Sequence, residues 1–223
     1  MSKFKSLSNL ISGKVTLWVT GLMLTLFQFT AARAQFSDSA RDVNWSAAGL
    51  TFDNFRIVQP ARKGQQLSVG AVTSSQPGVE VSVSDIDLQR ILKISMTNRF
   101  NYNKSWVSAD ALKDSGLLQH EQGHFDLNEI YTRKTFQQFQ QVKFTNNFKA
   151  EIATIMEAMN KELSKVQKNY ERQTLHGLLK ENQAIWNQRI AMALQQLPPY
   201  ENKHISQTLP PENGSKATEY RRQ

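Results

Sequence analysis

Two histidines stand four residues apart in the block HEQGHFD, with a glutamate directly after the first. On an α-helix, His120 and His124 differ by about 40° and lie one turn apart on the same face. Both imidazoles can then reach one cation at the roughly 2.0–2.1 Å that zinc–nitrogen bonds require. Glu121 lies about 60° from His124, beside the ligand face, as the helical repeat requires. The pattern predicts a zinc site in which Glu121 acts as general base on a zinc-activated water.

Other polar residues near this block are less well placed for a metal. Asp126 and Glu129 lie about 160° and 140° from His124 around the helix, so both carboxylates should point away from the ion. Asn128 shares the ligand face and could orient His124. The competing interpretation of the block is a pair of exposed helical histidines beside a glutamate.

A catalytic zinc usually has three protein ligands and one open position, so a third ligand must come from another element. His176 is the preferred candidate, because Gly177 would let the backbone approach the site closely. Glu171 and Glu181 are the main competitors, and His176 could instead make only capping bonds at a helix end. His204 lies in a Pro-rich segment, where a ligand is difficult to hold rigidly.

The elements that must position these residues fall into two regions. Residues 42–100 alternate with period 2 and predict strands, including a hairpin turning at Gln76-Pro77-Gly78. Residues 108–197 have helical spacing, and a long helix from about Asn147 carries one apolar stripe. We therefore predict an α+β fold: a small N-terminal β-sheet packs on the helix that bears the motif, and long C-terminal helices follow.

The two ends of the chain differ from this domain. Residues 1–34 combine basic residues, an apolar run and Ala32-Arg33-Ala34, which predicts a cleaved signal peptide and an exported, periplasmic or extracellular protein. Residues 35–197 form the predicted domain, and the Pro-rich residues 198–223 predict a disordered polar tail. No further segment predicts stable membrane insertion. The leader holds four of the 27 basic residues and no acidic ones, so the remainder has a net charge of about +4, which argues against nucleic acid as a partner.

Several blocks together resemble one family of secreted bacterial proteins of unknown function, described as predicted zinc-dependent proteases of the zincin superfamily. The resemblance runs from about Asn44 to Leu197 and rests on the blocks LTFDNF, NKSWV, HEQGHFDLNEIYTRK, YERQTLHG and QAIWN. It implies a zincin-like domain of residues 35–197, and it supports His176 because T-x-H-G matches the family's downstream block. In one departure, Glu171 follows Tyr170 where the family usually has aspartate.

These observations lead to an expected function. The chain would be a secreted zinc-dependent metallopeptidase in which His120, His124 and His176 hold Zn²⁺ and Glu121 is the base. Tyr170 could donate to the oxyanion, or it could simply pack in the core. VEVSVSD, which starts at Val79, is a candidate strand for a peptide or protein substrate to pair with by β-addition. The alternatives are a zinc-dependent amide hydrolase acting on cell-wall material and a non-catalytic, zinc-stabilised binding module of the envelope. No oligomeric state is predicted.

Overall fold

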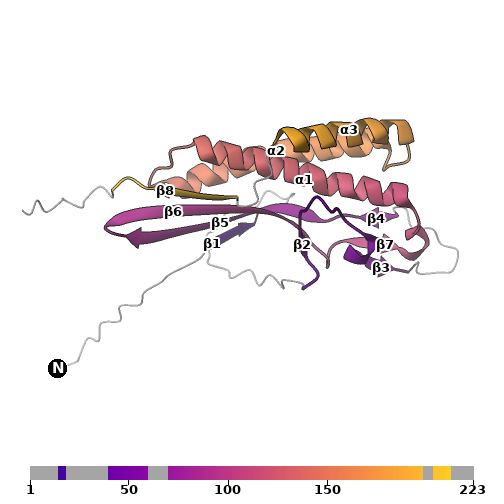
Figure 1. The fold of residues 1–223 in the computed structure, drawn as a ribbon, viewed down its shortest axis with the longest axis horizontal. Coiled ribbons are helices and arrows are strands. Elements are labelled where there is room, and N and C mark those ends of the chain that lie inside the picture. Colours follow the sequence, from indigo (N-terminus) through magenta and orange to yellow (C-terminus); the bar gives the residue numbers. More distant parts are fainter. Residues whose placement is uncertain (1–14, 19–39, 60–69, 198–202, 212–223) are drawn as a thin grey trace, which may run out of the picture.

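Two β-sheets and three long helices make up the described part of the chain (Figure 1), which in this computed structural model comprises residues 15–18, 40–59, 70–197 and 203–211. The larger sheet contains β1 (Val15–Trp18), β2 (Val43–Asn44), β5 (Ser75–Ile86), β6 (Gln89–Phe100) and β8 (His204–Thr208). The smaller sheet contains β3 (Arg56–Val58), β4 (Ala71–Val72) and β7 (Trp106–Ser108). The helices are α1 (Ser115–Gln141), α2 (Phe148–Thr174) and α3 (Lys180–Gln196), with short 3₁₀ turns at Phe52–Asn54 and Ala109–Ala111. The predicted α+β class is confirmed.

The larger sheet is built around the long β5–β6 hairpin. Its ladder runs from Ser75 opposite Phe100 to Ile86 opposite Gln89, and the turn is formed by Asp87 and Leu88, both with positive φ. The turn predicted at Gln76–Gly78 is wrong, because these residues belong to β5. Pro77 is tolerated there since it lies near the outer edge of the sheet, just before the stretch of β5 that pairs with β1.

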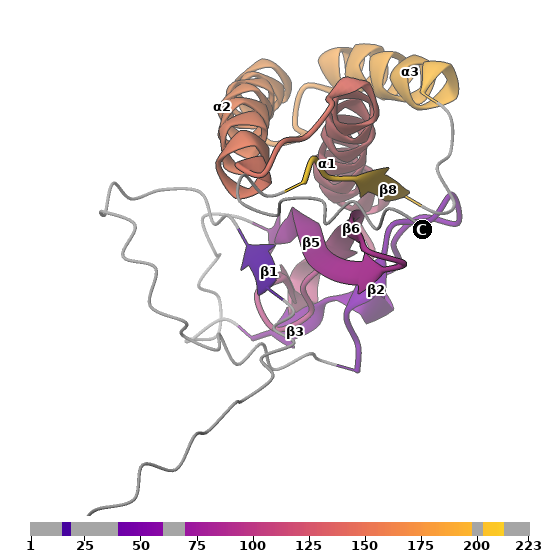
Figure 2. The same ribbon diagram turned by 90° about the vertical axis from the view of Figure 1, so that its left-hand side faces the viewer.

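Helix α1 lies between the larger sheet and the other two helices (Figure 2). The inward side chains of β5 and β6 meet α1 and the apolar stripe of α2, and this layer forms the main core. The stripe predicted for α2 is present, and its buried members are Ile152, Met156, Met159, Leu163 and Tyr170. Three to four residues separate most of them, so the helix presents one apolar face to the core.

The smaller sheet fixes where α1 begins. Strand β7 pairs with β3 in parallel and with β4 antiparallel, and the chain then passes through a 3₁₀ turn to Asp114. The Asp114 carboxylate accepts a hydrogen bond of 3.0 Å from the Leu117 N–H and so caps α1. The first turns of α1 therefore lie close to β4, and the two histidines come two turns into the helix.

The C-terminal tail differs from its prediction. Residues His204–Thr208 form β8, which pairs antiparallel with Ile91–Ser95 of β6. Ile205 packs on the core and Leu209 is buried, so this part of the predicted disordered tail is ordered by the apolar side chains that it contributes. Residues 198–202 and 212–223 lie outside the described residues.

The predicted leader also falls mostly outside the described residues. Its one described stretch, Val15–Trp18, forms β1 and pairs antiparallel with Gly78–Val81 of β5. Within the described ranges, no helix has the length and apolar character needed to cross a bilayer.

Candidate metal centre

Three side chains from two helices bring their ligand atoms together. The Nε2 atoms of His120 and His124, both on α1, are 3.2 Å apart. Glu171, in the last turn of α2, places Oε2 at 3.2 Å from His120 Nε2 and Oε1 at 3.2 Å from His124 Nε2. Within the described part of the chain, this is the group of His and acidic side chains that could hold a metal ion.

The separations fit a tetrahedral zinc site. Zinc–ligand bonds of about 2.0–2.1 Å at tetrahedral angles place neighbouring ligand atoms roughly 3.3 Å apart. The three distances in this group are each 3.2 Å. The donor set of two imidazoles and one carboxylate is also one that catalytic zinc sites use. His120, His124 and Glu171 therefore suit the metal without rearrangement of the helices.

A glutamine on α3 fixes the tautomer of His120. Gln183 donates its amide N–H groups to the Tyr170 hydroxyl at 2.7 Å and to Asn187 Oδ1 at 2.8 Å. Its amide oxygen, 3.1 Å from His120 Nδ1, must therefore accept a hydrogen bond from that nitrogen. With the proton on Nδ1, the Nε2 lone pair of His120 points into the group.

A second glutamine does the same for His124 from α2. Gln167 donates to the His124 carbonyl and to Asn128 Oδ1, both at 3.0 Å. Its amide oxygen lies 2.6 Å from His124 Nδ1, so that nitrogen is the donor and Nε2 is free to bind a metal. Asn128, predicted to orient His124, acts on it through Gln167.

These two glutamines are functional residues that the sequence analysis missed. Gln183 belongs to the QAIWN block, but neither residue has a local pattern that predicts a contact with a histidine on another helix. Only the packing of α2 and α3 against α1 brings them to the imidazoles.

The charges of the group are strongly coupled. Burial raises the pKa of Glu171, but the hydrogen bonds with His120 and His124 outweigh it and hold the pKa well below its usual range. Burial lowers the pKa of His124, yet the hydrogen bond with Glu171 and the negative charge of Glu121 shift it upward overall. An anionic Glu171 thus favours a protonated, positively charged His124, and a bound cation would satisfy the same preference.

Tyr170 lies behind the group rather than in front of it. It is fully buried, its ring stacks on His120, and its hydroxyl donates to the His120 carbonyl at 2.9 Å. Tyr170 does not line either of the two cavities that border the group, so the structure does not bring its hydroxyl to where an oxyanion would form. A Cβ at Gly123 would overlap this hydroxyl, which explains the glycine within the HEQGH block. Burial raises the pKa of Tyr170 far above its usual value.

His176 does not join the three ligand atoms. Its side chain is 66% exposed, and its Nδ1 lies 2.9 Å from Glu171 Oε2. Helix α2 ends at Thr174, and Leu175, His176 and Gly177 all have positive φ, so His176 lies in the turn after α2 and not on the helix face of Glu171. Among the described residues, Glu171 rather than His176 joins the two histidines in the group that could hold a metal, and His176 contacts that carboxylate. Gly177 does make the predicted close approach, since a Cβ there would be 2.9 Å from His120 Cβ.

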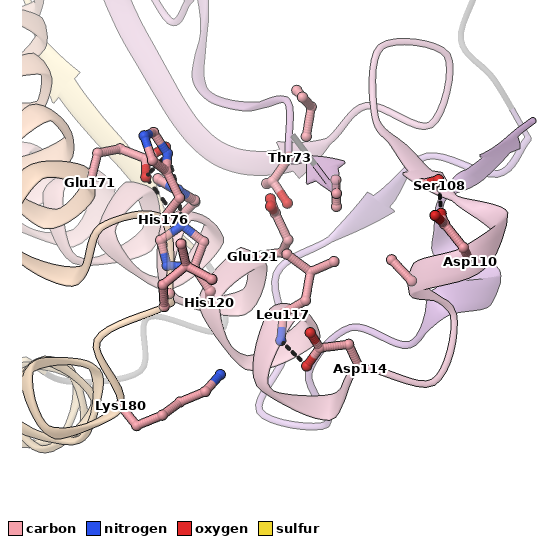
Figure 3. Close-up of a pocket in the computed structure, with 17 residues that line it drawn as sticks. Thr73, Ser108, Asp110, Asp114, Leu117, His120, Glu121, Glu171, His176 and Lys180 are labelled. Carbon is pink, nitrogen blue, oxygen red and sulfur yellow. Dashed lines mark hydrogen bonds and ion pairs between the residues drawn. The ribbon is translucent and has the colours of Figure 1, made fainter. Parts of the chain in front are cut away.

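A cavity of about 660 Å³ opens beside the group (Figure 3). Glu121 lines it from α1, and Thr73 lines it from the segment after β4. Figure 3 shows the Glu121 side chain pointing toward Thr73. Glu121 is 3% exposed, and its Oε2 has no hydrogen-bond partner among the described residues. The Thr73 hydroxyl is likewise buried without a partner there.

The remaining candidates lie elsewhere. Asp126 accepts hydrogen bonds of 2.7 Å from Trp45 and from Gln122, and Glu129 forms an ion pair with Arg133. Both point away from the group, as the helical angles predict. Glu181 and His204 lie outside the group, and neither lines the cavity.

Comparison with known proteins gives one match. The family model described as a bacterial protein of unknown function (DUF922) matches residues 83–177, which is less than half of the chain. No curated protein and no solved structure matches the chain. The matched segment runs from the end of β5 to the loop after α2. It therefore contains all three proposed ligands as well as Glu121 and His176.

Proposed function

We propose that this protein is a zinc-dependent hydrolase of peptide bonds with a zincin-like site. His120, His124 and Glu171 would hold the ion, and Glu121 would serve as general base. Zinc in such a site supplies Lewis acidity, which activates water and polarises a carbonyl.

The buried, unpartnered oxygen of Glu121 carries this proposal. Removing a carboxylate oxygen from water without a hydrogen bond costs free energy, and buried polar atoms in native proteins are usually paired. Glu121 Oε2 has no partner among the described residues, although the residue is almost fully buried and lines the cavity beside the ligands. A water molecule or substrate group in the cavity would satisfy this oxygen, and a general base needs that arrangement.

The protein's own groups would act in a defined order. Glu121 Oε2 accepts the proton of the attacking water and later delivers it to the leaving amine. Gln183 and Gln167 keep the Nδ1–H tautomers of His120 and His124, so both Nε2 lone pairs remain directed at the ion. The Tyr170 hydroxyl donates a hydrogen bond to the His120 carbonyl and so fixes the position of His120 on α1 relative to α2.

The cavity also offers backbone groups to a peptide. The Ser108 N–H donates to the Gly70 carbonyl at 2.8 Å, so the backbone groups of Gly70 point toward β7. Because these directions alternate along an antiparallel strand, the N–H and C=O of the next residue, Ala71, point away from β7. Within the described residues β4 is an edge strand, and Gly70–Thr73 line the cavity. The backbone of β4 is therefore better placed for β-addition than VEVSVSD, which does not line this cavity.

A catalytic site fits better than a structural one. Structural zinc sites are closed by four protein ligands, whereas this group supplies three among the described residues and borders a cavity. Hydrolysis of an amide in cell-wall material would use the same residues and differs only in the substrate. The basic, apolar and small-residue pattern of residues 1–34 supports an exported protein.

The substitution Glu121→Gln tests the proposal. Zinc content by metal analysis should stay at the wild-type level, because Glu121 is not a ligand, while hydrolysis of a casein-derived peptide mixture should fall about 10²–10⁴-fold. Glu162→Gln, an exposed and isosteric change on α2, is the matched control and should leave both measurements unchanged. Full hydrolysis by Glu121→Gln, or a wild type that binds no zinc, would disprove the proposal.

A further inference from the structure

A second cavity, of about 780 Å³, also reaches the candidate metal group. It is bounded by the start of β5 and by α2, and it shares Thr73, His124, Glu171 and His176 with the first cavity. The metal group therefore lies where two cavities meet. A peptide bound across the group would extend into both of them.

The two cavities differ sharply in charge. The second is lined by the cations Lys104, Lys168 and Arg172, and we call it the basic arm. Its single acidic lining residue among those described is Glu171, which is already engaged with three histidines. The first cavity instead contains Asp110, Asp114 and Glu121 together with one cation, Lys180.

The cations of the basic arm are not neutralised within the described part of the protein. Arg172 donates to the amide oxygen of Asn169 at 3.1 Å, and neither it nor the two lysines forms an ion pair with a described carboxylate. Three like charges around one cavity repel each other, and an anion between them would relieve this repulsion.

A buried donor points to the same kind of ligand. Asn160 lines the basic arm, and its Nδ2 is buried without a hydrogen-bond acceptor among the described residues. An unpaired buried N–H group costs free energy until an acceptor arrives. The arm thus offers positive charge and a hydrogen-bond donor, whereas its one described carboxylate, Glu171, is already paired. A carboxylate, with two acceptor oxygens, satisfies both requirements.

We propose that the basic arm binds a carboxylate of the substrate next to the scissile bond, so that the enzyme prefers peptides that place a carboxylate there. This inference rests on the proposed hydrolase function. The carboxylate has two sources, the side chain of Asp or Glu and the C-terminal carboxylate of a peptide.

Three randomised octapeptide libraries distinguish these sources. The first contains Asp and Glu and has an amidated C-terminus. The second has Asn and Gln in their place, and the third repeats the second with a free C-terminal carboxylate. Cleavage by the purified, zinc-loaded protein is followed by mass spectrometry, and retention by the Glu121→Gln variant is measured by equilibrium dialysis. We expect the first or the third library to be preferred about tenfold over the second, the size of effect expected for charge-assisted contacts.

The variant Lys168→Glu/Arg172→Glu should abolish this preference, in cleavage and in retention alike, while keeping its zinc. Lys149→Glu, on an exposed position in the first turn of the same helix and outside both cavities, is the matched control and should keep the preference. Preference for the first library assigns the arm to acidic side chains, and preference for the third assigns it to the C-terminus.

Other outcomes separate this inference from the function on which it rests. Equal cleavage of all libraries by a zinc-loaded wild type overturns the inference alone, and so does a preference that survives the double substitution. Selective retention without hydrolysis supports the basic arm and counts against the hydrolase. If the protein neither retains nor hydrolyses any of the libraries, both the inference and the proposed function are overturned.

Discussion

Helix α1 contributes to two clusters of ionisable side chains, and they are balanced in opposite ways. In its second half, Glu129 Oε1 lies 2.8 Å from Arg133 Nε and 2.9 Å from Lys203 Nζ, and both partners belong to the protein. In its first half, the imidazoles of His120 and His124 turn their Nε2 atoms toward each other and toward Glu171. The Glu129 cluster brings cations to an anion, and we call it the ion-pair cluster. The histidine cluster, formed by His120, His124 and Glu171, brings electron-pair donors to one point.

This difference separates a structural cluster from the proposed metal site. Arg133 also donates to the carbonyls of Leu194 and Leu197, so it ties α1 to the end of α3, and Lys203 ties β8 to the same place. Glu129 has one unpartnered oxygen, as Glu121 does, but two cations neutralise its charge. Within the described residues, no Lys or Arg side chain pairs with the histidine cluster, and the proposed zinc ion would supply its positive charge.

The largest expected effect comes from removing a ligand of the histidine cluster. Glu171→Ala or His120→Ala should lower zinc affinity by more than the roughly 10–100-fold that loss of an outer partner causes, and abolish hydrolysis. His176→Ala should keep a full equivalent of zinc, because its nitrogen contacts the carboxylate rather than the group itself. Isothermal titration with zinc after chelation measures both. A zinc-free His176→Ala beside a zinc-loaded Glu171→Ala would restore His176 as the third ligand.

The opposite result is expected from the ion-pair cluster. Arg133→Met leaves the buried Glu129 with one cation and two backbone carbonyls without their donor, so the free energy of unfolding should fall by about 3–5 kcal/mol. Zinc affinity of the folded fraction should not change. Urea denaturation gives the stability, and Lys134→Met, on an exposed neighbouring position of α1, should cost less than about 1 kcal/mol. A loss of zinc binding in folded Arg133→Met would mean that the two clusters are coupled.

The sequence predicts those parts of the site that depend on local geometry. The spacing of His120 and His124 places both on one face of any helix, and the angles for Asp126 and Glu129 hold for the same reason. The third ligand depends on where α2 ends. No local signal marks Thr174 as the last helical residue or gives Leu175 a left-handed conformation, so the sequence alone favours His176 over Glu171.

The same limit explains the differences in the fold. Gln76-Pro77-Gly78 has the composition of a turn, but the partner strand β6 holds these residues in a continuous ladder. The tail is rich in proline and polar residues, yet β6 offers its edge to His204–Thr208 and the core accepts Ile205. In both cases a strand distant in sequence overrides the local preference. Gln167 and Gln183 were missed because their contacts also join separate helices.

The smallest of the three effects tests whether the histidine cluster is pre-oriented by its glutamines. Gln167→Leu removes the acceptor for His124 Nδ1–H and releases the tautomer, so zinc affinity should fall by about 10–100-fold while the three ligands remain. Gln167→Glu keeps an acceptor at the same atom and should recover most of the loss, which a purely structural role for Gln167 does not predict. Competition with a fluorescent zinc chelator measures the affinities. If both variants bind zinc as the wild type does, the imidazoles need no external orientation, and the comparison between the clusters rests on their ligand atoms alone.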